Sequence, residues 1–405
     1  MSPGPPATSP GPPATSPGPP ATSPGPPAMS PGPADGSGPG PAGGSGSGAR
    51  PAWPRGVAVR LAPLAPLALA LALVAGLCAL LGASPAAVAA GLWEGAFGTA
   101  DQAARVLATL APLLLCGSGL LFTFRAGLYH LGVEGQLVIG AVCATGASRA
   151  LWPGLPAGLV VALSIAAGAL GGVLWGALTG ALHTRARVSE IFAGLGMNFV
   201  AQGAVLYLVF GPWKRPGVAS MAGTEPLDGA LRLSTLGGTD LSPAALLLAA
   251  LALVGAAVVL GRTHFGLRLR AVGLSPEAAA VLGVPAAREM LAAFAISGAL
   301  AGVAGALQVL GTFHRLLPNV SSNLGFLALL VVMLAGRRAA LVAPIALFFS
   351  ALNVGSLKLP MTLGLESSLA GVLQGALVLL ALLSPWSARG ARGARGARGG
   401  RPEEA

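Results

Sequence analysis

A nearly continuous apolar region, from about residue 61 to residue 384, limits what this chain can fold into. Short polar segments divide the region into runs that are mostly as long as one membrane crossing, for which a helix needs about 20 apolar residues. The runs do not alternate between apolar and polar side chains, and they are too long for the strands of a membrane barrel. The sequence therefore predicts an all-α, polytopic bundle of membrane helices.

The composition excludes most soluble alternatives. Only 9% of the 405 residues are charged and the mean hydropathy is +0.76, whereas about a quarter of the residues in a soluble domain are charged. So few charges cannot cover the surface of a soluble enzyme or a secreted scaffold of this length. Cys78, Cys116 and Cys143 lie in apolar runs without metal-ligand spacing, so we expect neither a disulfide framework nor a metal site.

The apolar runs predict about ten transmembrane helices. The eighth run is short for a full crossing, so one helix could be re-entrant or split. The expected helices cover residues 61–81, 104–123, 129–148, 157–182, 189–210, 243–260, 289–311, 323–335, 340–356 and 368–384.

The positions of the 24 lysines and arginines indicate how the helices are oriented. Cytoplasmic loops of membrane proteins carry an excess of these residues. When both termini are placed in the cytoplasm, most of the 24 fall on the inner side, including five arginines near the C-terminus. The net charge of +11 is therefore interpreted mainly as a topology signal and not as a sign of nucleic-acid binding.

Both ends of the chain are repetitive. Residues 1–55 hold repeats of Ser-Pro-Gly-Pro-Pro-Ala-Thr and a Gly/Ser/Pro-rich segment, and residues 386–405 repeat Ala-Arg-Gly. Such compositions cannot bury a core, so they predict disordered tails and leave 56–385 as the membrane domain. The Arg-Gly tail could contact nucleic acid or the lipid of the inner leaflet, and we favour lipid, or no specific partner.

No catalytic or ATP-binding pattern is present in the sequence. It lacks a GxxxxGK[ST] phosphate loop, an HExxH zinc pattern and a nucleophile elbow. The four histidines are far apart along the chain. We therefore expect a protein that is not an enzyme and holds no cofactor, which leaves transport, channel formation or a structural role in the membrane.

The basic inner loop 261–288 contains the pattern of a helix of about two turns. It has an N-cap serine, a proline at the first helical position, an acid in the first turn, alanines that continue the helix, and a glycine at its end. These residues are Ser275, Pro276, Glu277, Ala278, Ala279 and Gly283. Such a helix could dock a soluble partner or could simply lie in the lipid interface, and spacing alone leaves both open.

Polar side chains surround a glycine-rich break at 122–140. Irregular backbone inside a membrane must line a cavity or be buried in protein. His130 and Glu134 are four residues apart, so a helix would place them on one face, with Gln136 nearby. The segment could line a substrate pathway, or it could be a polar latch between helices in which Glu134 is neutral or caps a half-helix.

Asn198 and Gln202 are also four residues apart and fall in the middle of a predicted span. Uncharged amides suit a neutral polar ligand. They suit hydrogen bonds between helices equally well, which contribute about 1 kcal/mol or less each.

Glycines at every fourth position predict smooth faces where neighbouring helices approach closely. The predicted packing positions are Gly168, Gly172, Gly176 and Gly180 on one helix, and Gly298 and Gly302 on a later one.

Three segments together resemble one family. The run LYHLGVEGQLVIG at 128–140 is similar to the family segment FNIGVEGQ…G, and residues 266–311 are similar nearly throughout to RAVGxNPEAAxxxGI…FxxSGALAGLAGA. Residues 189–198 resemble the helix start NE…MLN. The family is that of the permease subunits of bacterial ATP-binding-cassette (ABC) importers for nucleosides and simple sugars, within the branched-chain amino acid permease-like superfamily. The likeness covers roughly 60–385 and is greatest to the first permease of nucleoside systems.

The resemblance implies a permease subunit that forms the pathway for a small polar solute in the bacterial cell membrane. It implies a second homologous permease, a separate cytoplasmic ATPase that uses the ATP, and an extracytoplasmic substrate-binding lipoprotein. It also implies that the helix at 275–283 contacts the ATPase. His130 and Ser275 each stand where the family usually has Asn; the first leaves the specificity open, whereas Ser caps a helix equally well.

We expect the pathway to use His130, Glu134, Gln136, Asn198 and Gln202. A nucleoside is the first expectation for the cargo, with a simple sugar or an amino acid as the alternative. A self-sufficient secondary transporter would need membrane carboxylates for coupling ions, and only Glu134 and Glu190 qualify.

Overall fold

The computed structural model describes residues 84–217, 223–336 and 338–364, together with Ala72, Gly76, Ala79, Gly371, Val372 and Gly375. All of these belong to the second of two compact units, Pro54–Ala405. The predicted helices at 61–81 and 368–384, apart from these isolated positions, and both repetitive ends lie outside the described residues.

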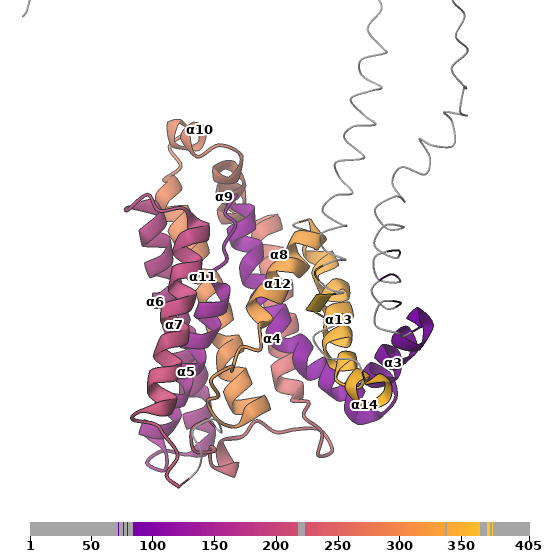
Figure 1. Cartoon of the computed structure of the whole chain (residues 1–405). Helices are drawn as coiled ribbons and strands as arrows, with labels where there is room; N and C mark the ends of the chain where they lie inside the picture. The colour runs from indigo at the N-terminus through magenta and orange to yellow at the C-terminus, as the bar shows by residue number, and fades with distance from the viewer. Residues whose placement is uncertain are drawn as a thin grey trace, which may run out of the picture. The chain divides into compact units, whose positions relative to one another are not determined.

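Helices account for nearly all the regular structure of the described residues (Figure 1). A single bridge between Lys214 and Thr224 is the one β-type pairing found among them. The elements are α3 (Pro85–Phe97), α4 (Ala100–Arg125), α5 (Val133–Leu151), α6 (Ala157–Thr184), α7 (Glu190–Phe210), the 3-10 turn η2 (Gly229–Leu231), α8 (Pro243–Arg262), α9 (His264–Leu274), α10 (Pro276–Val281), α11 (Ala286–Leu307), the π-helix η3 (Gln308–Phe313), α12 (Leu324–Ala335), α13 (Ala339–Ser356) and α14 (Leu359–Leu363).

Each predicted helix that falls on described residues is present, and the predicted all-helical bundle is confirmed there. Six helical segments in this part are long and apolar enough to cross a membrane: Ala100–Arg125, Ala157–Thr184, Glu190–Phe210, Pro243–Arg262, Ala286–Phe313 and Ala339–Thr362. α12 is a shorter apolar helix of 12 residues, as the length of its apolar run predicts.

Three short helices were not predicted: α3, α9 and α14, the last of which has five residues. α3 has 13 residues, fewer than a membrane crossing requires, although Ser84 caps it and Pro85 stands at its first position. α9 occupies part of the basic loop 261–288, where the hydroxyl of Thr263 accepts a hydrogen bond from the backbone N–H of Gly266 at 3.3 Å. Both α3 and α9 begin at a hydroxyl N-cap, as α10 does at Ser275, but neither contains an apolar run of membrane-spanning length.

α4 lies at the centre of the described bundle. It packs against α8, α11, α12 and α13. In its most apolar stretch of 18 residues 83% of the residues are buried, whereas in the corresponding stretch of α8 only 17% are. Side chains such as Leu113, Leu120 and Leu121 are almost completely buried. α8 instead leaves about half of its apolar side chains exposed, on a surface that a lipid or a partner helix would cover.

Glycines allow α6 and α11 to touch backbone to backbone. A Cβ at Gly172 would overlap the carbonyl oxygen of Gly298, and a Cβ at Gly298 would overlap that of Gly172. Gly302 meets the carbonyl of Gly168 in the same way. The two remaining glycines of α6, Gly176 and Gly180, face the backbone and the ring of Phe294. This contact fixes α11 against α6 and thereby the position of the polar groups described next.

Candidate functional site

The break between α4 and α5 is the irregular segment 126–132, which we call the linker. Gly127 has φ +79°, and a Cβ there would lie 3.1 Å from the carbonyl oxygen of Gly273. A left-handed backbone conformation and a close neighbour together require glycine at this position. The linker therefore lies in close contact with the end of α9. The break between two helices is the one that the glycine-rich pattern predicts.

Glu134 caps a helix that lies far from it in sequence. Its Oε2 atom accepts a hydrogen bond from the backbone N–H of Gly325 at 2.7 Å, and the carboxyl also accepts from the N–H groups of Asn323 and Phe326 and from Ser321. These are the unpaired donors at the start of α12, where a negative charge is favourable. The sequence leaves open whether the segment lines a substrate pathway or forms a latch in which Glu134 caps a half-helix. The contacts of Glu134 are those of such a cap.

His130 and Gln136 form a buried polar pair. Their Nε2 atoms are 2.7 Å apart, so the Gln136 amide donates to the ring nitrogen. The hydroxyl of Ser297 on α11 donates to Oε1 of Gln136 at 3.4 Å, and the ring of Phe294 meets His130 edge-on. The expectation that His130 and Glu134 share a helical face is wrong, because α5 begins only at Val133 and leaves His130 in the linker.

Asn198 fastens the linker to α7. Its Oδ1 atom accepts from the N–H of Gly135 at 2.8 Å, and its Nδ2 atom donates to the carbonyl of Leu131 at 2.9 Å. One turn further along α7, Gln202 donates to the carbonyl of Pro318 at 2.6 Å. The two amides of α7 therefore hold both irregular segments, the linker and the one that precedes α12.

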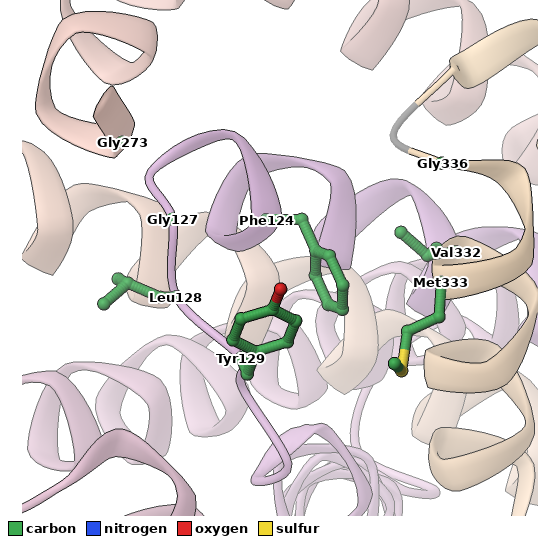
Figure 2. A pocket seen from close by; sticks show the side chains of 8 residues that line it. All are labelled: Phe124, Gly127, Leu128, Tyr129, Gly273, Val332, Met333 and Gly336. Carbon is green, nitrogen blue, oxygen red and sulfur yellow. The ribbon is translucent and has the colours of Figure 1, made fainter. Parts of the chain in front are cut away.

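A pocket of about 350 Å³ is lined in part by the linker (Figure 2). The rings of Phe124 and Tyr129 meet edge to face, with centroids 5.4 Å apart, and they face Val332 and Met333 on α12 (Figure 2). Tyr129 is 50% exposed. The residues that line the pocket are Phe124, Gly127, Leu128, Tyr129, Gly273, Val332, Met333 and Gly336.

None of the five predicted pathway residues lines this pocket. Their hydrogen bonds connect the linker, α5, α7, α11 and the segment that leads into α12, whereas Phe124, Tyr129 and Met333 line the pocket. Tyr129 is not among the predicted pathway residues, although it is the second residue of the segment 128–140. An aromatic side chain between two glycines in a helix break was the signal that could have identified it.

The predicted short helix of the inner loop is confirmed as α10. The hydroxyl of Ser275 accepts a hydrogen bond from the N–H of Ala278 at 3.2 Å, Pro276 occupies the first position, and Gly283 follows with φ +80°. α9 precedes α10 at one end of the bundle (Figure 1). An ion pair between Arg268 and Glu289, with 3.0 Å between Nε and Oε1, ties α9 to α11.

The bundle, its interrupted helices and its exposed capped helix define a multi-pass membrane protein of the transport class. The sequence profile of the family described as branched-chain amino acid transport system / permease component matches residues 102–382. The chain belongs to this family. It is a permease component of an ABC transport system, and the resemblance drawn from the sequence is confirmed.

Curated relatives extend the comparison. The guanosine ABC transporter permease protein NupP of Bacillus subtilis (strain 168) is 30% identical over 327 residues, which cover 79% of this chain and 92% of the relative. The glucose ABC transporter permease protein TsgB13 of Haloferax volcanii is 29% identical over 69% of this chain and 75% of its own. The nucleoside ABC transporter permease protein NupB of Lactococcus lactis subsp. cremoris is 24% identical over 65% and 75%. No solved structure matches.

Proposed function

We propose that this chain forms part of the transmembrane pathway of an ABC importer for nucleosides. The observation that carries the proposal is the similarity to the guanosine permease, which extends over 92% of that relative. Nucleosides are small and uncharged, and the lining of the pocket between the linker and α12 contains no charged side chain among the described residues.

The pocket supports this cargo by its chemistry. Aromatic rings stack on nucleobases, and each such contact contributes about 1–3 kcal/mol. Phe124 and Tyr129 provide two rings at one wall, and the flexible Met333 faces them. In this proposal the base lies against Tyr129 while the cargo passes the linker.

The five polar residues act in this proposal by positioning the pocket wall. His130 and Gln136 hold the linker against α11, and Asn198 holds it against α7. Glu134 and Gln202 hold the start of α12 and the segment before it. A change between outward and inward access would require these bonds to shift together.

The energy would come from ATP hydrolysis on a partner subunit that docks at α10. Leu274, Val281 and Leu282 are each about four-fifths exposed or more, and exposed apolar side chains of this size suit a protein interface. Movement of α10 would reach α11 through α9 and the Arg268–Glu289 ion pair. The complete importer would also contain a second permease and an extracytoplasmic binding lipoprotein, in a bacterial membrane with both termini of this chain in the cytoplasm.

Uptake in cells tests the proposal. A strain that lacks this chain but keeps the other subunits should lose uptake of labelled guanosine and regain it when the full chain is restored. Unchanged uptake in the deletion strain would refute the proposed function.

Tyr129→Ala tests the pocket. Loss of one stacking contact should raise the KM for guanosine about tenfold, with little change in the amount of protein in the membrane. The matched control is Tyr207→Ala, since Tyr207 is 72% exposed on α7 and lies outside the pocket. Equal behaviour of the two variants would show that the pocket is not on the pathway.

A simple sugar is the second candidate cargo, favoured by the similarity to the glucose permease of Haloferax volcanii. Sugars also stack on aromatic rings, so the pocket alone does not exclude them. Competition separates the two: excess unlabelled adenosine should block guanosine uptake, whereas excess glucose should not.

A further inference from the structure

Three arginines converge on a second pocket of about 330 Å³. Arg125 comes from the end of α4, Arg270 from α9, and Arg338 from the residue before α13. Gly273, Leu274 and Gly336 complete the lining, so within the described part of the chain no carboxylate faces this pocket. We call it the arginine pocket.

Two of these arginines lack a counterion among the described residues. Arg270 and Arg338 are exposed and form no ion pair with any residue in that part of the chain, whereas Arg268, two positions from Arg270, is paired with Glu289. Like charges around a cavity repel one another, and a bound anion offsets this repulsion. The planar guanidinium group matches the oxygens of a phosphate, to which it can donate two parallel hydrogen bonds.

The arginine pocket adjoins the aromatic pocket. Gly273 and Gly336 belong to the lining of both, and neither residue has a side chain that would close the boundary. The volume of each pocket lies within the range of about 300–1,000 Å³ that is usual for small-molecule sites. A ligand with an aromatic part and a negatively charged part could therefore occupy both.

We propose that the arginine pocket binds the phosphate group of a nucleoside monophosphate whose base lies in the neighbouring aromatic pocket. The choice of a nucleoside rests on the proposed function; the choice of a phosphate ester rests on the three arginines. Because the positive-inside distribution places these arginines at the cytoplasmic end, the ligand would enter from the cytoplasm. It would compete there with a nucleoside that is leaving the pathway.

Binding to the full-length chain in lipid nanodiscs tests the proposal. Guanosine 5′-monophosphate should bind at least about tenfold more tightly than guanosine, and inorganic phosphate should compete with it. Arg270→Gln and Arg338→Gln should each weaken nucleotide binding about tenfold, as expected for the loss of a charge-assisted hydrogen bond, and should leave guanosine binding unchanged. Arg262→Gln, an exposed arginine in the last turn of α8 outside the pocket, is the matched control and should bind the nucleotide like the unaltered chain.

Two results would overturn the proposal. The first is equal binding of the nucleotide by the Arg270, Arg338 and Arg262 variants, after thermal unfolding has shown that all three are folded. The second result comes from varying the lipid. The nucleotide would fail to bind in phosphatidylcholine discs, and the unaltered chain would retain phosphatidylglycerol that the Arg270→Gln variant loses. These two observations together would assign the pocket to a lipid headgroup. Neither result would change guanosine uptake by cells. Failure of the nucleotide proposal is therefore distinguishable from failure of the proposed function.

Discussion

Removal of the Glu134 carboxylate should destabilise the start of α12. In Glu134→Ala, the backbone N–H groups of Asn323, Gly325 and Phe326 lose their acceptor. The site is closed to water, because Glu134 is only 7% exposed and Gly325 is buried against its backbone. The donors therefore have no ready replacement.

The magnitude follows from the number of bonds lost. Loss of a helix N-cap costs about 0.5–2 kcal/mol, and each buried donor left without a partner costs about 1–3 kcal/mol, although hydrogen bonds within membranes average less. We expect Glu134→Ala to lower the free energy of unfolding by about 2–4 kcal/mol. Glu134→Gln keeps one acceptor oxygen but loses the charge and the second acceptor, so it should cost less than Glu134→Ala, about 1–2 kcal/mol.

Thermal and denaturant unfolding of the purified chain in detergent would measure the loss of stability in the Glu134→Ala and Glu134→Gln variants. The matched control is Glu225→Ala, because Glu225 is exposed, and its effect should be within about 0.5 kcal/mol. If Glu134 acted on the cargo instead, Glu134→Gln would raise the KM for uptake while both Glu134 variants unfolded like the control. That result would refute the assignment of Glu134 as a cap.

Two further predictions concern the packing of α6 on α11 and the capping of α10. Gly172→Ala places a Cβ on the carbonyl oxygen of Gly298, so it should cost about 1–3 kcal/mol and lower the folded yield, whereas Gly196→Ala on α7, where nothing lies within 4 Å, should be neutral or slightly stabilising; equal yields of the two variants would contradict the packing. Ser275→Ala removes the cap of α10, which contributes about 1 kcal/mol, and should reduce cargo-stimulated ATP hydrolysis by the assembled importer, with Ser275→Asn restoring it; unchanged hydrolysis in Ser275→Ala would argue against docking at α10.

Membrane helices could be predicted from the sequence because length and hydropathy are local properties. The runs that became α4, α6, α7, α8 and α11 are each long enough to cross a bilayer and were placed to within a few residues. α3, α9 and α14 are not predicted because each is short and none forms a long apolar run. α10 could be predicted because its cap and proline are adjacent in the sequence and its glycine follows seven positions later, within one short segment.

The polar contacts could not be derived from spacing. Asn198 was paired with Gln202 on one helix, but its partners are Leu131 and Gly135, more than 60 positions earlier. Glu134 meets Gly325 across 191 positions. Such pairs depend on which helices become neighbours in the bundle, and only the glycine contact between α6 and α11 gave a hint of that in the sequence.

Transport by the reconstituted importer tests the central claim most directly. The full-length chain, the second permease, the ATPase and the binding lipoprotein would be placed in sealed liposomes, and labelled guanosine would be followed with ATP on the side of the ATPase. We predict accumulation that requires both ATP and this chain and that survives the collapse of every ion gradient. Accumulation that an ion gradient drives without ATP, or that continues when this chain is omitted, would contradict the account.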